Sequence, residues 1–298
     1  MHKVMRSLAL FAALGAVGCG DSPSQMADMA IPPDMAMTPP PPLYLQDSTG
    51  AQKPADYSCL GTRTDPAAPT ADYVLTGKVA DFQDNDPVAG AVVSVYLDAQ
   101  SVAMNQPAAQ SMPSAMDGTY TLTVPKGQYR VIFGTRGGKA ISSGGTAKDT
   151  IDTFEFGRAY KDAGRTAVKV TTRDAIPGLV SVVPDVTLGV IAGSVRDCAG
   201  KEVGGAKVAI TGTSAMYDAA SLTFYFTDVG GATLPTRKLK WTDGANGVFA
   251  ALNVPPGSAT VTAIGIVGSG DLKTLGAQSI NVPSGAVTIV EVLPTAAK

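Results

Sequence analysis

The sequence is poor in histidine and glutamate. Its only histidine is His2, and glutamate occurs only at Glu155, Glu202 and Glu291 among 25 acidic residues. Because the first 18 residues have the pattern of a cleaved signal, the mature chain is expected to contain no histidine. That excludes Ser-His-Asp and Cys-His catalysis and histidine-ligated zinc. Aspartate, the other acid, often shapes turns. We therefore expect a protein that is not an enzyme and that has no cofactor apart from a lipid.

Charged residues are also scarce. They make up 16% of the 298 residues, and the net charge is −2. Non-specific binding to nucleic acid depends on clustered lysine and arginine, and the chain has no basic run. We therefore expect no nucleic-acid partner. With 45% hydrophobic residues, 33 glycines and 21 prolines, the chain is too apolar to be disordered and too interrupted to be helical.

The amino terminus has the pattern of an export signal. Lys3 and Arg6 precede an apolar run over residues 7–17, which is too short to cross a bilayer as a helix and is typical of a secretory signal. The run ends in AVGC at Cys19, which resembles the lipobox of bacterial lipoproteins. The resemblance implies a signal peptide over residues 1–18 and a lipid on Cys19 that anchors the protein to a membrane. An ordinary signal peptide that happens to contain a cysteine is the alternative.

Residues 19–46 are predicted to be a disordered, proline-rich tether. Gly20–Pro42 holds seven prolines and four methionines, and a proline-rich chain extends by ~3.1 Å per residue. The methionine thioethers could suit Cu(I), but their spacing defines no geometry, and a plain spacer is preferred. With the lipobox, the tether favours an outer-membrane lipoprotein of the cell envelope, facing either the periplasm or the surface.

The rest of the chain has an internal repeat of strand-like segments. Residues Thr119–Val124 alternate polar and apolar, as a half-buried strand does. Four blocks recur in the same order, namely Thr76–Asp81 and Ala192–Asp197, Gly90–Val95 and Gly205–Ile210, Asp117–Tyr120 and Asn246–Phe249, and Val124–Gly127 and Val254–Gly257. We therefore predict an all-β fold with two tandem β-sandwich modules, at residues 47–183 and 184–298.

The block order resembles that of carboxypeptidase regulatory-like domains, which are transthyretin-like (prealbumin-like), Ig-like β-sandwiches. Their motifs are Gly-x-Val-x-Asp, Gly-Ala-x-Val-x-Val, Asp/Asn-Gly-x-aromatic and Pro-x-Gly. The resemblance covers roughly residues 72–134 and 187–292, and it implies a non-catalytic accessory domain. Residues 135–186 depart from the pattern. They contain strand-like runs at 150–156, 166–172 and 179–183 that we assign to neither module.

Cys59 and Cys198 remain once Cys19 carries the lipid. An even pair of cysteines in an oxidising compartment favours a disulfide. Such a bond would tie the segment before the first module to the first loop of the second module. Two unconnected thiols are the alternative.

An acidic loop is a weak candidate for calcium. Asp81, Asp84 and Asp86 lie within six residues, and calcium takes 6–8 oxygen ligands. The loop lacks the glycine and the bidentate glutamate of an EF-hand, so a solvated turn is the preferred reading.

An aromatic insertion in the second module is a candidate binding platform. Residues 222–226 and 237–241 flank a Gly230-Gly231 turn, which predicts a hairpin. Tyr225, Lys238 and Trp241 could bind a glycan or a peptide there. In the alternative reading, these aromatics close the sandwich core.

These observations favour a lipid-anchored, non-catalytic cell-envelope protein whose β-sandwich modules bind or scaffold a protein partner. A glycan- or polysaccharide-binding surface module is the alternative. A hydrolase that uses two aspartates is less favoured, because it needs two carboxyls ~5–9.5 Å apart in a cleft, and no pattern in the sequence pairs them.

Overall fold

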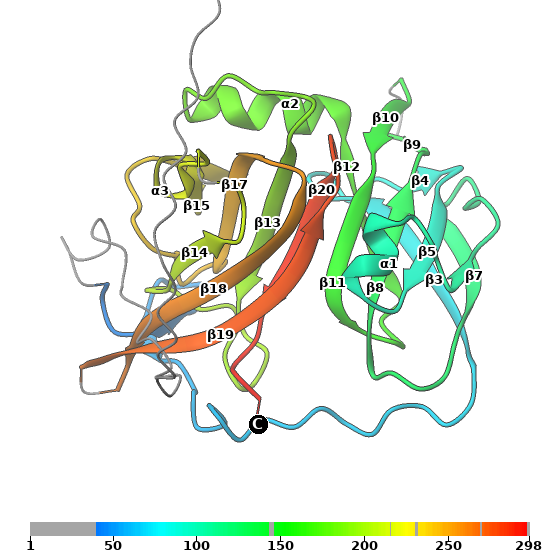
Figure 1. Cartoon of the computed structure of the whole chain (residues 1–298). Helices are drawn as coiled ribbons and strands as arrows, with labels where there is room; N and C mark the ends of the chain where they lie inside the picture. Colours follow the sequence, from blue (N-terminus) through cyan, green and yellow to red (C-terminus); the bar gives the residue numbers. More distant parts are fainter. Residues whose placement is uncertain (1–39, 143–145, 215, 230–231, 269, 297–298) are drawn as a thin grey trace, which may run out of the picture. The chain divides into compact units, whose positions relative to one another are not determined.

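The chain folds mostly as β-strands. The computed structural model describes residues 40–142, 146–214, 216–229, 232–268 and 270–296 (Figure 1). Helices in this part are short, namely α1 (Ala99–Ala103), α2 (Val170–Leu179) and α3 (Ala219–Leu222). The predicted all-β class is confirmed. The predicted signal peptide, Cys19 and most of the predicted tether lie outside the described residues.

The four recurring sequence blocks form equivalent strands. In the first copy β3 pairs with β7 and β5 with β8, and in the second copy β13 pairs with β17 and β14 with β18, all antiparallel. Their bounds are β3 (Tyr73–Asp81), β5 (Val92–Tyr96), β7 (Thr119–Val124), β8 (Arg130–Arg136), β13 (Gly189–Val195), β14 (Lys207–Thr211), β17 (Val248–Val254) and β18 (Gly257–Val267).

Two further strands extend the repeat. β11 (Thr153–Ala159) pairs antiparallel with β8, as β19 (Asp271–Val282) pairs with β18. β12 (Gly164–Lys169) runs parallel to β3, as β20 (Val287–Val292) runs parallel to β13. The unassigned stretch 135–186 therefore supplies the last two strands of the first copy.

Two of the strand-like runs in that stretch turn out differently from the sequence pattern. The run 166–172 is a strand only as far as Lys169 and then continues as α2. The run 179–183 is not a strand, because Leu179 ends α2 and a turn follows, in which the amide of Val182 donates to the carbonyl of Pro177.

In each copy, a glycine on one strand (β3 or β13) allows the neighbouring parallel strand (β12 or β20) to approach closely. A Cβ atom at Gly77 would lie 1.8 Å from the carbonyl oxygen of Ala163, and one at Gly193 would lie 2.0 Å from that of Val290. No side chain fits at such distances, so the Gly-x-Val motif is required by the backbone packing in both copies.

The two copies are joined in one continuous sheet. Its nine strands run in the order β16-β15-β17-β13-β20-β11-β8-β5-β6, and β11 and β20 meet as parallel neighbours. A six-stranded sheet (β4-β9-β10-β12-β3-β7) and a three-stranded sheet (β14-β18-β19) pack on it. The remaining strands are β1 (Tyr44–Gln46), β2 (Gln52–Pro54), β4 (Val88–Ala89), β6 (Ala109–Gln110), β9 (Lys139–Ala140), β10 (Lys148–Ile151), β15 (Thr223–Val229) and β16 (Ala232–Thr236). The module bounds at 47–183 and 184–298 stay a prediction.

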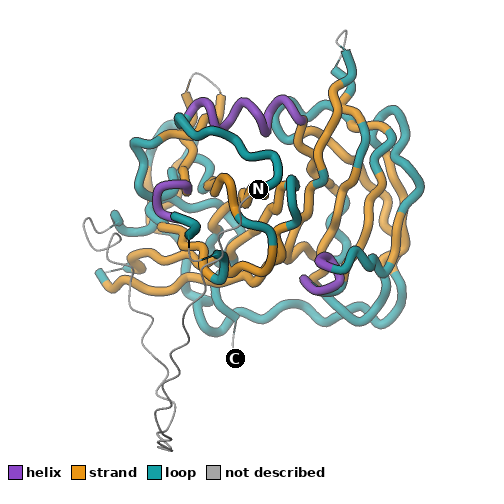
Figure 2. The backbone as a smooth tube through the Cα atoms, turned by 45° about the horizontal axis from the view of Figure 1, so that its top comes forward, coloured by secondary structure: helices purple, strands orange, loops and turns teal. Residues whose placement is uncertain are grey.

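The two hydrophobic cores lie on opposite faces of the nine-stranded sheet. On β8, Phe133 belongs to the core with the six-stranded sheet, and its neighbour Ile132 belongs to the core with the three-stranded sheet. Side chains alternate between faces along a strand, so each flanking sheet covers one face over about half of its width. Helix α2 lies across one end of the strands (Figure 2), and its Ile176 packs against a small cluster that contains Leu252 of β17.

Residues 40–46 belong to the folded part, which corrects the predicted end of the tether. Leu43 and Leu45 are buried, and the amide of Leu43 donates to the carbonyl of Ile266 at 3.0 Å. β1 then pairs with β2. The apolar side chains at the end of the proline-rich segment have a core to enter, so a tether extending to residue 46 is wrong.

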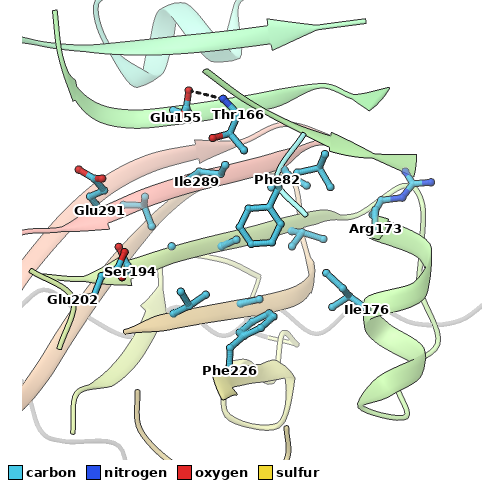
Figure 3. Close-up of a pocket in the computed structure, with 18 of the residues that line it drawn as sticks. Phe82, Glu155, Thr166, Arg173, Ile176, Ser194, Glu202, Phe226, Ile289 and Glu291 are labelled. Atoms are coloured by element: carbon cyan, nitrogen blue, oxygen red, sulfur yellow. Dashed lines mark hydrogen bonds between the residues drawn. The ribbon is translucent and has the colours of Figure 1, made fainter. Parts of the chain in front are cut away.

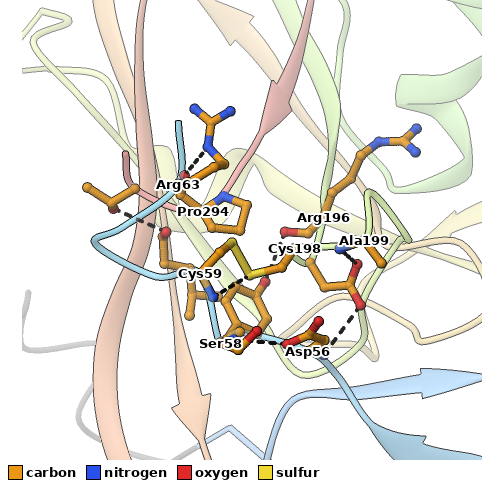
Figure 4. The surroundings of a disulfide bond; sticks show 12 residues. Asp56, Ser58, Cys59, Arg63, Arg196, Cys198, Ala199 and Pro294 are labelled. Carbon is orange, nitrogen blue, oxygen red and sulfur yellow. Dashed lines mark hydrogen bonds between the residues drawn. A yellow bond between two sulfur atoms is a disulfide. The ribbon is translucent and has the colours of Figure 1, made fainter. Parts of the chain in front are cut away.

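The predicted disulfide between Cys59 and Cys198 is confirmed (Figure 4). The two Cα atoms are 5.8 Å apart, within the usual range for a bridge. Around it, the amide of Cys198 donates to the carbonyl of Asp56, and Arg63 Nε donates to the carbonyl of Pro294. The segment before the first copy is therefore fastened to the second copy.

Removing this disulfide should destabilise the protein strongly. The bond joins residues 139 positions apart, and on the chain-entropy model closing such a loop contributes ~5 kcal/mol. We expect the Cys59→Ser/Cys198→Ser double variant, and the wild type in reductant, to show the same large fall in melting temperature. If reductant also lowered the melting temperature of the double variant, the effect would not come from this bond.

Candidate functional site

The second copy has a groove on the nine-stranded sheet. It lies on the face opposite the core that this sheet forms with the three-stranded sheet (β14-β18-β19). Its volume is about 270 Å³, and its floor is formed by β17, β13 and β20. Val168 of β12 and Phe82 form a wall, and Arg173 and Ile176 of α2 lie across one end (Figure 3).

The floor changes from apolar to polar along its length. Across the parallel strands β13 and β20, Val190 is the register partner of Val287, Ala192 of Ile289, and Ser194 of Glu291. β17 adds Val248, Ala250 and Leu252. The groove is therefore mostly apolar, with polar groups gathered at the end away from α2 (Figure 3).

All three glutamates of the chain line this groove, and each is paired with arginine. Glu155 Oε2 lies 3.0 Å from Arg165 Nη1, in a pair that is almost fully buried. Glu291 Oε1 lies 2.5 Å from Arg158 Nη1 and 3.4 Å from Arg196 Nε.

Glu202 completes the network, since its Oε1 lies 3.0 Å from Arg196 Nη2. The ion pairs therefore run from β12 across β11 and β20 to the loop after β13.

Acids and arginines are balanced in the lining of the groove, which contains Glu155, Glu202 and Glu291 and also Arg158, Arg173 and Arg196. Arg158 also lies 3.8 Å from Asp162, which is outside the lining. Burial raises the pKa of Glu202, and the negative charges of Glu291 and Asp228 add to the rise against the opposing effect of Arg196.

Several polar groups at this end of the groove have unused hydrogen-bonding capacity. The Nε atoms of Arg158, Arg165 and Arg196 are buried and have no hydrogen-bond partner among the described residues. Ser194 is 6% exposed, and its hydroxyl has no partner in the same part of the chain. The second oxygens of Glu202 and Glu291 accept no hydrogen bond there either, but these side chains are 36% and 20% exposed. Buried polar groups are usually satisfied, and the unsatisfied ones here are mainly arginine donors.

Sequence reasoning missed the groove. Glutamate is scarce in the sequence, but each glutamate lies on a different segment and no local motif links them. The usable signal is a glutamate between two apolar residues in each of two strands, FEF in β11 and VEV in β20.

The acidic loop already has a cation. Lys169 Nζ lies 3.1 Å from Asp81, 2.5 Å from Asp84 and 3.1 Å from Asp86. Burial lowers the pKa of Lys169, but hydrogen bonds to the three carboxylates outweigh it, and the net pKa is raised. A hydrogen bond from Ser142, and then one from Lys169, lower the pKa of Asp86.

The preferred prediction of a solvated turn is wrong for Asp81, which is buried and lies 3.1 Å from Lys169 Nζ. A calcium ion in this loop would have to displace the lysine. Among the described residues, no group of three or more His, Cys, Asp or Glu side chains is placed to hold a metal ion.

The predicted hairpin exists but is shorter than expected. β15 and β16 pair antiparallel, while residues 237–241 lie beyond the strand, and Gly230 and Gly231 are outside the described residues. Tyr225 is buried and accepts a hydrogen bond from the amide of Val208, and burial raises its pKa to about 12. Tyr225 is therefore a core residue and not part of a surface platform. Lys238 is exposed and Trp241 half-buried, and a binding role for these two stays a prediction.

Comparison with known proteins finds distant structural similarity to pilins. No family model and no curated protein sequence matches the chain. Among solved structures, the chain is similar to a streptococcal ancillary pilin (12% identity, 74% of this chain and 68% of that chain, TM-score 0.24). It is also similar to the shaft pilin SpaA from Lactobacillus rhamnosus GG (11%, 75% and 98%, TM-score 0.21) and to BcpA, the major pilin subunit of Bacillus cereus (10%, 75% and 71%, TM-score 0.21). TM-scores this low support no transfer of function.

Replacing Lys169, the buried lysine that pairs with the acidic loop, should lower the free energy of unfolding in a pH-dependent way. Lys169→Met leaves three neighbouring carboxylates without their counter-ion, and we expect a loss of about 3 kcal/mol at pH 7. The lowered pKa of Asp86 means that its contribution is present above the ordinary pKa of aspartate and is lost as the pH falls through the lowered value. The difference between variant and wild type, measured by urea unfolding, should therefore shrink below about pH 4.

The matched control is Lys139→Met, because Lys139 pairs with Asp149 on the surface, where both side chains are at least 60% exposed. Its effect should stay within about 1 kcal/mol. Equal losses in the two variants would contradict a special role for Lys169.

Proposed function

We propose that this protein is a lipid-anchored, non-catalytic component of the cell envelope, and that it binds a protein partner. The observation that carries the proposal is the open, mostly apolar groove on β17, β13 and β20 of the nine-stranded sheet, which α2 covers only in part. Exposed apolar side chains continue from its lining, since Phe82 is half exposed and Leu179 and Val183 more so. Contiguous exposed apolar surface is typical of protein-binding sites.

Other features support the envelope location and the absence of catalysis. The Cys59–Cys198 disulfide suits an oxidising compartment, and Cys19 lies in a lipobox-like motif. None of the helices in the described residues has the length and apolar character to cross a bilayer. The glutamates of the groove are tied to arginines, and this pairing does not suit a catalytic acid–base pair.

The lipid anchor predicts a simple outcome for Cys19→Ser. In a bacterial host, the wild type should incorporate labelled palmitate and sediment with membranes, because a multi-chain anchor holds a protein stably. Cys19→Ser should lose both properties. Cys59→Ser is the matched control and should keep the label. An unlabelled wild type, or a labelled Cys19→Ser variant, would contradict the anchor.

Partner binding can be tested in intact cells. Val183 is 85% exposed, and its neighbour Val182 packs against the cluster that contains Leu252 of the groove. A photo-reactive residue at position 183 should give one discrete covalent adduct with another protein. The same residue at Lys273, on an exposed part of β19, is the control and should give none. Equal adducts from both positions, or none from position 183, would argue against a partner at this face.

A further inference from the structure

We infer that the groove is filled by residues 179–186 of a second molecule of this protein, and that two molecules exchange these residues reciprocally. The inference rests on the proposed function and adds that the partner is another molecule of the same chain. It depends on how residues 179–186, called the 179–186 segment below, are held, on their position beside the groove, and on the charge of both surfaces.

The 179–186 segment is held in one conformation by the structure beneath it. The side chain of Asn253 binds it twice, because Nδ2 donates to the carbonyl of Val183 at 2.9 Å and Oδ1 accepts from the amide of Asp185 at 3.0 Å. Ser181 and Asn253 both have a left-handed backbone, with φ of 53° and 52°. Such strain persists only where the surrounding structure imposes it, so the segment has a fixed shape before any partner binds.

This fixed segment presents apolar side chains to solvent. Val180 is buried and Val182 packs beside it in the same cluster, which anchors the segment from below. Leu179, Val183 and Val186 are 58%, 85% and 57% exposed. Single exposed apolar residues are ordinary, but several on one short segment mark an interaction surface. Because the segment is already ordered, little conformational entropy is lost when it binds.

The segment and the groove form one continuous apolar surface. Val182 packs against the cluster that also contains Leu252 and that Ile176 and Val190 contact, and these three residues line the groove. The segment does not enter the groove of its own molecule, because Asn253 holds it in place and Arg237 Nε donates to the carbonyl of Val180 at 2.6 Å.

A surface that carries both a projection and a hollow suits reciprocal pairing. In a two-fold dimer the same patch of both molecules is used, so each molecule can place its projection in the hollow of the other. The groove volume of about 270 Å³ is too small for a folded element and admits the side chains of a short segment. Val183, which projects furthest into solvent, is the side chain expected on the apolar floor at Ala192 and Ile289.

The charges of the two surfaces match. Residues 175–184 contain no charged side chain, and the three acids in the lining of the groove are balanced by three arginines. A strongly charged segment would find no excess of opposite charge there and would have to leave water. An uncharged apolar segment loses little on entering, so the 179–186 segment has the chemistry that the groove accepts.

The test uses intact cells that produce two full-length forms of the chain with different tags. Only one form carries the photo-reactive residue, at position 183. We expect an adduct that contains both tags and twice the mass of the chain, with the cross-linked peptide from β13, β17 or β20. The same residue at Lys273 is the control and should give no two-tag adduct. An adduct without the second tag, a cross-link outside these strands, or no adduct would overturn the inference.

Filling the groove should block the exchange. Ala192→Leu in the form without the photo-reactive residue should lower the two-tag adduct at least tenfold, because its side chain occupies the floor. Ala103→Leu makes the same change at an exposed position in α1, and it is the matched control that should leave the adduct unchanged. Equal adducts with the two variants, both with the melting temperature of the wild type, would overturn the inference.

A second measurement changes the segment instead of the groove. Val183→Asp in both forms should lower the co-purification of the two tags in mild detergent at least tenfold, since a charge would enter an apolar cavity. Leu272→Asp is the matched control on β19, where Leu272 is 40% exposed, and it should change nothing. Unchanged co-purification of a folded Val183→Asp protein would overturn the inference even if Ala192→Leu failed to fold.

The outcomes separate this inference from the proposed function. If position 183 is cross-linked only to a different protein, the exchange between two molecules is wrong and partner binding at this face stands. If position 183 gives no adduct and Cys19→Ser remains on the membrane, the proposed function fails together with the inference.

Discussion

The parallel pairing of β20 with both β11 and β13 is the interaction on which the rest of the structure depends. β20 joins the sheet of the first copy to that of the second. Its sequence, VTIVEV, has four apolar residues of six, and apolar runs are typical of parallel strands. Without β20 the nine-stranded sheet would divide into two, and the groove would lose the middle of its floor together with Glu291.

Glu291 connects the two copies electrostatically at the same place. Its Oε1 atom lies between Arg158 of β11 and Arg196, which follows β13. The free energy needed to remove charges from water offsets much of the attraction between the partners of such a pair. The ion pairs are therefore weak evidence for stability, and a need for charge at that position explains them better.

Local patterns in the sequence predicted the features that depend on neighbouring residues, namely individual strands and the internal repeat. Alternation identified Thr119–Val124, and the glycine motifs identified the repeat that β3, β5, β13 and β14 follow. Strand pairings and ion pairs between distant segments could not be predicted. Nothing in VTIVEV specifies β11 and β13 as its neighbours, and Lys169 is more than 80 residues from the aspartates that it neutralises. Helix α2 was missed because its sequence, VTTRDAIPGL, contains two threonines and a proline, which favour helices poorly.

Comparison of the two copies argues that the groove is a specialised site. The positions equivalent to Ala192 and Ser194 are Thr76 and Lys78, both exposed on β3, and the positions on β7 equivalent to Ala250 and Leu252 are also exposed threonines. The first copy therefore presents to solvent a polar face, as an antiparallel sheet commonly does. At these equivalent positions the second copy has three apolar residues, Ala192, Ala250 and Leu252, beside Ser194. α2 covers only part of the face, so that a cavity remains. If these apolar residues served only to form a core, α2 would have to fill the cavity. Apolar residues around a cavity that stays open, with three scarce glutamates at its end, are better explained by a ligand than by packing alone.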